Sequence, residues 1–194
     1  MNYFKRAICC VLVLMLAGCE ESSPTHGAGR PSGSANRNSV LPKNSSLQST
    51  PFIQAGLKEP KTFNPDEVDL PDDFEVVGIT VGTASRAYAV RDLTPMRSHV
   101  VNDVLENSAV SVTYCDRSNV SRAFSDSTSG KPIDLFTGGW MDDSMLLMLD
   151  GKFFSQEAKE VPLKVHRHER TTWGEWKLLH PATTIYVAKQ PIVK

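Results

Sequence analysis

The sequence is poor in cysteine and has no excess of charge of either sign. Its 194 residues include four cysteines, and 21 Lys and Arg side chains are balanced by 22 Asp and Glu. Nucleic-acid-binding domains usually present a basic face, so this balance predicts no nucleic-acid partner. The one long apolar stretch, residues 8–17, is shorter than the roughly 20 residues that a permanent transmembrane helix needs.

Motifs of familiar enzyme chemistry are also missing. The sequence contains no glycine-rich phosphate loop, no serine nucleophile elbow and no HExxH zinc motif. It therefore offers no catalytic residue and no cofactor to predict. We expect a domain that does not catalyse a reaction.

The first 18 residues follow the pattern of a secretory signal peptide. Two basic residues precede the apolar residues 7–15, an order that is typical of such signals. Residues 16–19 read Leu-Ala-Gly-Cys and resemble the bacterial lipobox, in which cleavage falls just before a cysteine that carries a diacylglyceryl group. We therefore predict a signal peptide over residues 1–18 and a lipoprotein held in the lipid bilayer through Cys19.

The residue after the lipidated cysteine bears on the choice of membrane. In similar lipoproteins of double-membraned bacteria, an Asp at that position retains the protein in the inner membrane, whereas this chain has Glu20. We therefore expect the outer membrane, with the domain facing the periplasm or the exterior and an envelope protein as a possible partner.

The mature chain is expected to keep a single free thiol. Cys9 and Cys10 leave with the signal peptide and Cys19 is acylated, so Cys115 is the one that remains and no intramolecular disulfide can form.

The mature chain changes composition along its length. Residues 22–51 are dominated by Ser, Thr, Asn, Gly and Pro. Such a segment buries too little apolar surface to offset the entropy of ordering it. We therefore predict a disordered tether over residues 19–72 and a single globular domain over residues 73–194.

Short apolar segments separated by turn residues predict a β-dominated α+β domain of antiparallel strands. Residues 75–81 and 86–90 are expected to form a hairpin, and residues 109–115 alternate apolar and polar side chains as a strand does. Further strands are expected at residues 120–124, 144–149, 161–166 and 184–187.

Two short helices complete the predicted fold. Residues 95–105 place apolar side chains at helical intervals after Pro95. Residues 171–179 begin with two threonines that suit an N-cap, followed by a glutamate that suits the reciprocal capping position. Trp173 and Trp176 lie three residues apart in this helix, a spacing that favours core packing over a ligand platform.

Four motifs occur in a fixed order within the predicted domain. They read Ser-Arg-Ala-Tyr at residues 85–88, Val-Asn-Asp at 101–103, Val-Thr-Tyr-Cys at 112–115 and Thr-Thr-Trp-Gly-Glu-Trp at 171–176. In order and spacing they resemble a bacterial family known only as a domain of unknown function, whose members typically read ARAYP, HEIVND, VTYCPLCG and TTWGEWKxxHPxT. The resemblance covers most of residues 74–187. It implies a shared fold and supplies no reaction.

The sequence departs from the family pattern where the family carries potential ligands. Ser118 occupies the position of a second cysteine, and Ser98 that of a histidine, with His99 one residue later. Two thiols and an imidazole would suit a soft metal or redox chemistry. This chain keeps one of those three groups, Cys115.

Cys115 therefore has three open interpretations. It is a small buried hydrophobic residue at a strand end, a transition-metal ligand together with His99, or a reactive thiol activated by a nearby arginine. Tyr114, Trp173 and Trp176 are candidates for the core or for a pocket. We expect a membrane-anchored envelope lipoprotein with a non-catalytic binding or assembly domain. The alternative is a metal- or redox-linked periplasmic protein with a site centred on Cys115.

Overall fold

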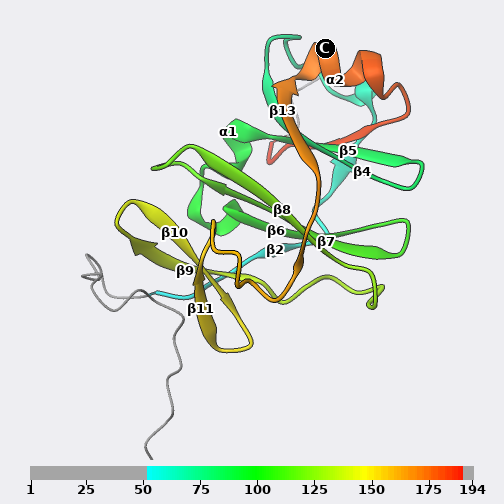
Figure 1. Ribbon diagram of the computed structural model, residues 1–194. Coiled ribbons are helices and arrows are strands. Elements are labelled where there is room, and N and C mark those ends of the chain that lie inside the picture. Colours follow the sequence, from blue (N-terminus) through cyan, green and yellow to red (C-terminus); the bar gives the residue numbers. More distant parts are fainter. Residues whose placement is uncertain (1–51, 190–194) are drawn as a thin grey trace, which may run out of the picture. The chain divides into compact units, whose positions relative to one another are not determined.

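The computed structural model of the chain describes residues 52–189. The predicted signal peptide, Cys19 and most of the predicted tether lie outside the described residues. Within them, strands dominate and form three sheets accompanied by short helices (Figure 1), which confirms the predicted β-dominated α+β fold. No helix of the described part is long and apolar enough to cross a membrane.

The three sheets are mostly antiparallel and are built from consecutive hairpins. Sheet A contains, in spatial order, β1 (Gln54–Ala55), β9 (Phe136–Met141), β10 (Ser144–Leu149) and β11 (Lys152–Ser155). Sheet B contains β12 (Lys164–Val165), β8 (Val120–Asp126), β7 (Ser108–Cys115), β6 (Val100–Leu105) and β2 (Leu57–Lys58). Sheet C contains β13 (His168–Thr172), β4 (Glu75–Val81), β5 (Ala84–Ala89), β14 (Thr184–Tyr186) and β3 (Thr62–Phe63). Two pairs, β2 with β6 and β14 with β5, are parallel.

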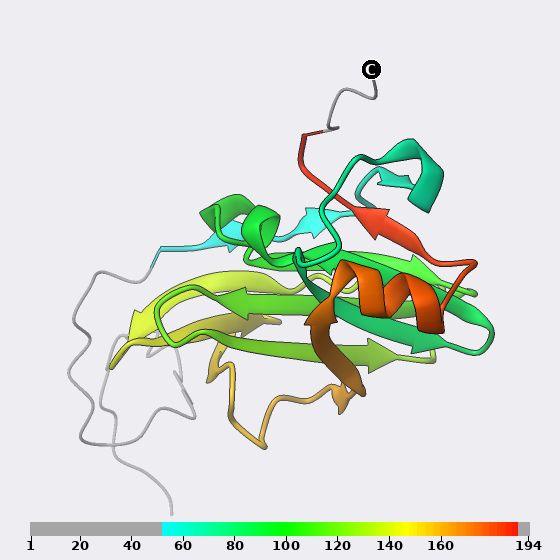
Figure 2. The same cartoon turned by 90° about the horizontal axis from the view of Figure 1, so that it is seen from above.

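Three apolar layers hold the sheets and helices together. One, which includes Tyr88 and Val112, packs sheet C against sheet B. A second, which includes Phe124 and Leu147, packs sheet B against sheet A. The third packs helix α2 (Trp173–Leu179) against the other face of sheet C. Sheet B is therefore buried on both faces (Figure 2).

Burial on both faces explains the composition of β7. Val110 and Val112 point into the layer shared with sheet C. Ser111 and Thr113 point to sheet A, where Ser111 Oγ donates a 2.6 Å hydrogen bond to the Asn102 side chain and Thr113 Oγ1 accepts one of 2.8 Å from Gln156. Their hydroxyl groups can be buried because each has a partner.

Helix α2 and the hairpin of β4 with β5 confirm two sequence predictions. Thr172 caps the helix, accepting a hydrogen bond from the Glu175 N–H, while the Glu175 carboxylate accepts one from the Thr172 N–H. This reciprocal capping satisfies donors that a helix start leaves free. The strand predicted over residues 161–166 is shorter than expected, because it is reduced to β12.

The helix predicted over residues 95–105 is wrong. The segment begins with a 3-10 turn, η2 (Met96–Ser98), after the short helix α1 (Val90–Leu93), and continues as strand β6. Val100 packs toward sheet A and Val101 toward sheet C. A strand buried on both faces loses its alternation of apolar and polar residues, so its pattern resembles that of a helix.

The domain boundary predicted at residue 73 is also wrong, because residues 52–72 contain β1, β2, β3 and the 3-10 helix η1 (Pro65–Glu67). β1 pairs with β9 of sheet A, β2 with β6 of sheet B, and β3 with β14 of sheet C. The segment Gln54–Phe63 therefore ties together the edges of all three sheets. It belongs to the folded domain.

Candidate functional site

Cys115 lies fully buried in the apolar layer between sheets A and B. Its thiol faces the backbone oxygen of Asp143 at 3.7 Å. The structure thus gives this side chain the surroundings of a small hydrophobic residue. Within the described residues, no group of three His, Cys, Asp or Glu side chains is placed to hold a metal ion.

His99 is buried as well, and its ring is held by its own contacts. Its Nδ1 lies 2.9 Å from the backbone oxygen of Leu93, and its Nε2 lies 3.6 Å from a carboxylate oxygen of Asp116. The ring also meets Trp140 edge to face, with centroids 5.7 Å apart. Nδ1 thus has a hydrogen-bond partner, and Nε2 faces the Asp116 carboxylate at a distance longer than a hydrogen bond.

The three aromatic candidates are core residues. Trp173 and Trp176 are each 1% exposed beneath α2, and the Trp176 indole N–H donates a 2.9 Å hydrogen bond to Thr183. Tyr114 packs between sheets B and C, with the Arg170 guanidinium over its ring at 5.6 Å. All three are core residues, although Trp176 also borders a small pocket, of about 210 Å³, together with His168 and His180.

Two of the sequence motifs meet between sheets B and C in an ion pair whose carboxylate is buried and whose guanidinium is half-buried. The Arg86 guanidinium donates to the Asp103 carboxylate, which also accepts a 2.7 Å hydrogen bond from the Tyr88 hydroxyl. Burial, followed by the charge of Asp103, raises the pKa of Tyr88 well above its ordinary value, so the phenol keeps its proton. Arg86 Nε donates to the Thr184 hydroxyl at 3.0 Å. The cluster is satisfied internally, and we assign it a structural role.

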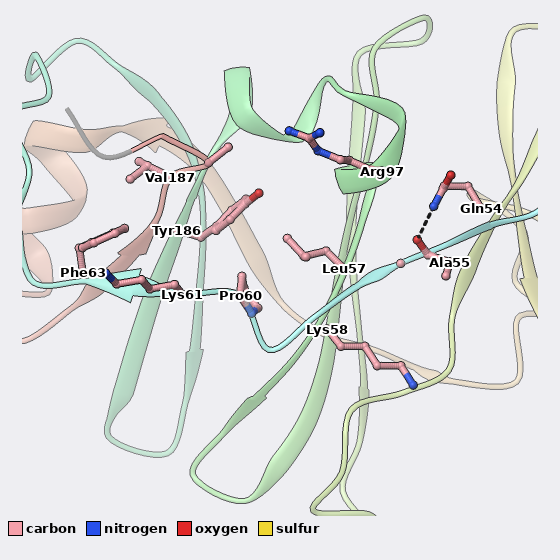
Figure 3. A pocket seen from close by; sticks show the side chains of 12 residues that line it. Gln54, Ala55, Leu57, Lys58, Pro60, Lys61, Phe63, Arg97, Tyr186 and Val187 are labelled. Atoms are coloured by element: carbon pink, nitrogen blue, oxygen red, sulfur yellow. Dashed lines mark hydrogen bonds between the residues drawn. The ribbon is translucent and has the colours of Figure 1, made fainter. Parts of the chain in front are cut away.

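A groove of about 610 Å³ lies where the segment Gln54–Phe63 passes β14 (Figure 3). Leu57, Phe63 and Tyr186 supply apolar and aromatic surface to its lining. Arg97, from η2, borders it as well. The volume lies within the range of small-ligand sites, which combine an apolar wall with a few polar groups.

The charged side chains of the groove are all cationic. Lys58, Lys61 and Arg97 line it, and its described lining contains neither Asp nor Glu. Lys58 forms an ion pair with Asp134. Lys61 and Arg97 form no ion pair with any carboxylate of the described residues.

Tyr186 lies between these two free cations. Figure 3 shows its ring with Phe63 and Lys61 to one side and Arg97 to the other, and the Lys61 ammonium lies 4.8 Å from the Phe63 ring centre. Burial, followed by the charge of Asp92, raises the pKa of Tyr186, whereas the charge of Arg97 lowers it. The phenol therefore remains neutral at physiological pH and can donate a hydrogen bond.

Comparison with known proteins places the chain in a family. A family model described as a protein of unknown function (DUF3179) matches residues 51–194. The chain belongs to this family. No curated protein and no solved structure matches it. The DUF3179 match begins one residue before the described structure does, so it includes the strands β1 to β3 that border the groove.

The groove of this DUF3179 domain could not have been found from the sequence motifs. Lys58 and Lys61 fall in the segment predicted as tether, and Arg97 in the segment predicted as helix. Tyr186 comes from the far end of the chain and reaches the groove through the pairing of β14 with β3. The one available signal was the run of Leu57, Phe63 and neighbouring apolar residues inside a supposedly disordered segment.

Proposed function

We propose that this DUF3179 protein is a lipid-anchored binding protein of the cell envelope, located in the outer membrane, whose groove binds an anionic ligand with an apolar part. The observation that carries the proposal is that Lys61 and Arg97, which have no ion-pair partner among the described residues, line one groove together with Tyr186 and Phe63, which are each 6% exposed. An anionic group bound between Lys61 and Arg97 would replace the water at both side chains, and the apolar part of the ligand would lie against Leu57 and the exposed edges of the two rings.

The lining is poorer in catalytic side chains than in binding groups. Ser, Cys, His, Asp and Glu, which commonly act in nucleophilic and general acid–base catalysis, do not occur in its described part. Lys58, Lys61 and Tyr186 are the lining residues whose types can also take such roles. The planar guanidinium of Arg97 is suited to a bidentate contact with a carboxylate, sulfonate or phosphate.

A dye that combines both features tests the groove. We expect 8-anilinonaphthalene-1-sulfonate to bind the mature chain, prepared with Cys19→Ser so that it carries no lipid, and to fluoresce. Arg97→Gln should weaken this binding about tenfold, because it removes a charge-assisted hydrogen bond. A fluorescence titration measures both affinities.

Arg167→Gln is the matched control. Arg167 is also an exposed arginine, but its partner is Glu169 and it lies outside the groove lining. We expect this variant to bind the dye as the parent chain does. Equal dye affinity of the Arg97→Gln variant and the parent would show that the groove is not the binding site.

The anchor is tested in the full chain. Cys19→Ser removes the thiol that would carry the diacylglyceryl group, so the protein should leave the membrane fraction and appear in the soluble fraction, or remain unprocessed. Fractionation with and without detergent measures this, and Cys115→Ser serves as the control that should stay membrane-bound. Normal maturation together with membrane retention of the Cys19→Ser protein would rule out the lipoprotein anchor.

A further inference from the structure

Two exposed apolar residues directly precede residues that line the groove. Ile53 precedes Gln54 and is 57% exposed, and Met96 precedes Arg97 and is 44% exposed. Ile53 lies next to β1, Met96 lies in η2, and η2 contacts β1. We refer to Ile53, Met96, Lys61 and Arg97 together as the rim of the groove.

We infer that this rim docks onto an anionic phospholipid surface, with the lipid headgroup as the anion taken by the groove; the inference rests on the proposed function. Interfacial protein surfaces combine apolar side chains that enter the acyl boundary with Lys and Arg that meet anionic headgroups. Ile53 and Met96 supply the first kind, and Lys61 and Arg97 the second. Tyr186 and Phe63 are each 6% exposed, so the contact with lipid would come from the four rim side chains.

The local charge agrees with this partner. Glu59 is the one carboxylate within residues 52–63, and it is not part of the groove lining. Each Lys or Arg near an anionic membrane contributes about 1 kcal/mol of attraction, which corresponds to about a fivefold change in partitioning. The rim has two such cations without a competing partner among the described residues.

The other exposed apolar residues are less suited to such a surface. Val165, in β12, is 62% exposed but stands alone, and single exposed apolar residues are normal. Leu178 and Leu179, at the end of α2, are 82% and 66% exposed. The surface depression beside Leu178 is bordered by two carboxylates, Asp72 and Glu175, and the single lysine there, Lys177, is bound to Asp72. An anionic membrane would repel this face.

The position of the anchor allows the rim to reach the bilayer. Cys19 precedes Phe52 by 33 positions, and a chain spans at most about 3.5 Å per residue. The chain enters the domain at Phe52, directly beside Ile53. The tether is therefore long enough for a domain held by Cys19 to bring its rim to the bilayer.

Vesicle binding tests the inference with the lipid-free mature chain, Cys19→Ser. We expect it to sediment with vesicles of equal parts phosphatidylglycerol and phosphatidylcholine and not with phosphatidylcholine alone. Lys61→Gln and Arg97→Gln should each lower the partition coefficient about fivefold. Ile53→Ser combined with Met96→Ser should lower it about tenfold. Leu178→Ser is the matched control and should bind as the parent does.

Three results would overturn the inference: no sedimentation with phosphatidylglycerol vesicles, sedimentation that the rim variants leave unchanged, or binding of poly-L-glutamate in place of vesicles, which would make the partner an acidic polypeptide. The dye titration shows whether a negative vesicle result contradicts only the membrane inference or also the proposed anion-binding function. If Arg97→Gln still weakens the dye but vesicles do not bind, the membrane inference fails and the anion-binding groove stands. If the dye is insensitive to Arg97→Gln, both fail.

Discussion

Replacing Asp103 by Leu is expected to lower the free energy of unfolding by about 1–3 kcal/mol, because the buried Tyr88 hydroxyl loses its acceptor and the half-buried Arg86 loses its partner. The Arg86 guanidinium would remain between sheets B and C without its carboxylate, and the Tyr88 hydroxyl would lose its acceptor. Urea denaturation followed by circular dichroism would show this as a lower midpoint at an unchanged slope.

The matched control removes the whole polar cluster. A variant with Arg86→Met, Tyr88→Phe and Asp103→Leu leaves no buried charge or hydroxyl of the cluster unpaired, so it should regain most of the lost stability. The contrast between the single and the triple variant separates the penalty of an unpaired charge from the value of the pair itself. If the single variant unfolds at the parent midpoint, Asp103 is not the buried partner that the structure shows.

The parts of the fold that sequence predicted correctly are those whose partners are close in the chain. β4 and β5 form a hairpin between adjacent segments, and α2 is defined by capping groups within one turn. In such elements the pattern of side chains and the structure have the same local cause. The alternation of residues 109–115 likewise identified β7, although it could not show that both faces of the strand are covered.

The parts that sequence misjudged depend on distant partners. β1, β2 and β3 have two residues each, too few to show an alternation, and each is held by a strand far along the chain. Composition could not reveal this pairing, because Gln54–Phe63 follows directly after a polar stretch. β6 was mistaken for a helix for a related reason. Its two faces are apolar because they pack against sheets A and C, and the residues of β6 alone do not indicate that these sheets lie on either side.

In the candidate site, too, sequence analysis identified residues by their type but could not identify those whose role depends on distant partners. Cys115 and His99 were singled out by residue type, and the fold buries both among other partners. Lys61 and Arg97 drew no notice because lysine and arginine are ordinary surface residues. Their significance arises only where η2 and the segment before β3 meet beside Tyr186.

Replacing Trp176 by Ala is expected to lower the free energy of unfolding by about 3–5 kcal/mol, since the ring is 1% exposed and its removal leaves a cavity between α2 and sheet C. The indole N–H also bonds Thr183, which would lose that partner. Leu178→Ala, on the exposed side of the same helix at 82% exposure, should leave the unfolding midpoint unchanged. Urea denaturation followed by circular dichroism compares the two.

Gly78 makes the packing of Trp176 testable from the opposite side. A Cβ added at Gly78 would lie 2.3 Å from the Trp176 ring, a separation that the fixed β4 backbone and the buried indole cannot relieve cheaply. Gly78→Ala should therefore destabilise the parent by about 1–3 kcal/mol through overpacking. In the Trp176→Ala background the same methyl group enters the cavity, so its cost should vanish or reverse. This coupling, measured as a double-mutant cycle, is the specific signature of direct contact between the two positions. Additive effects of the two substitutions would mean that Trp176 does not pack on Gly78.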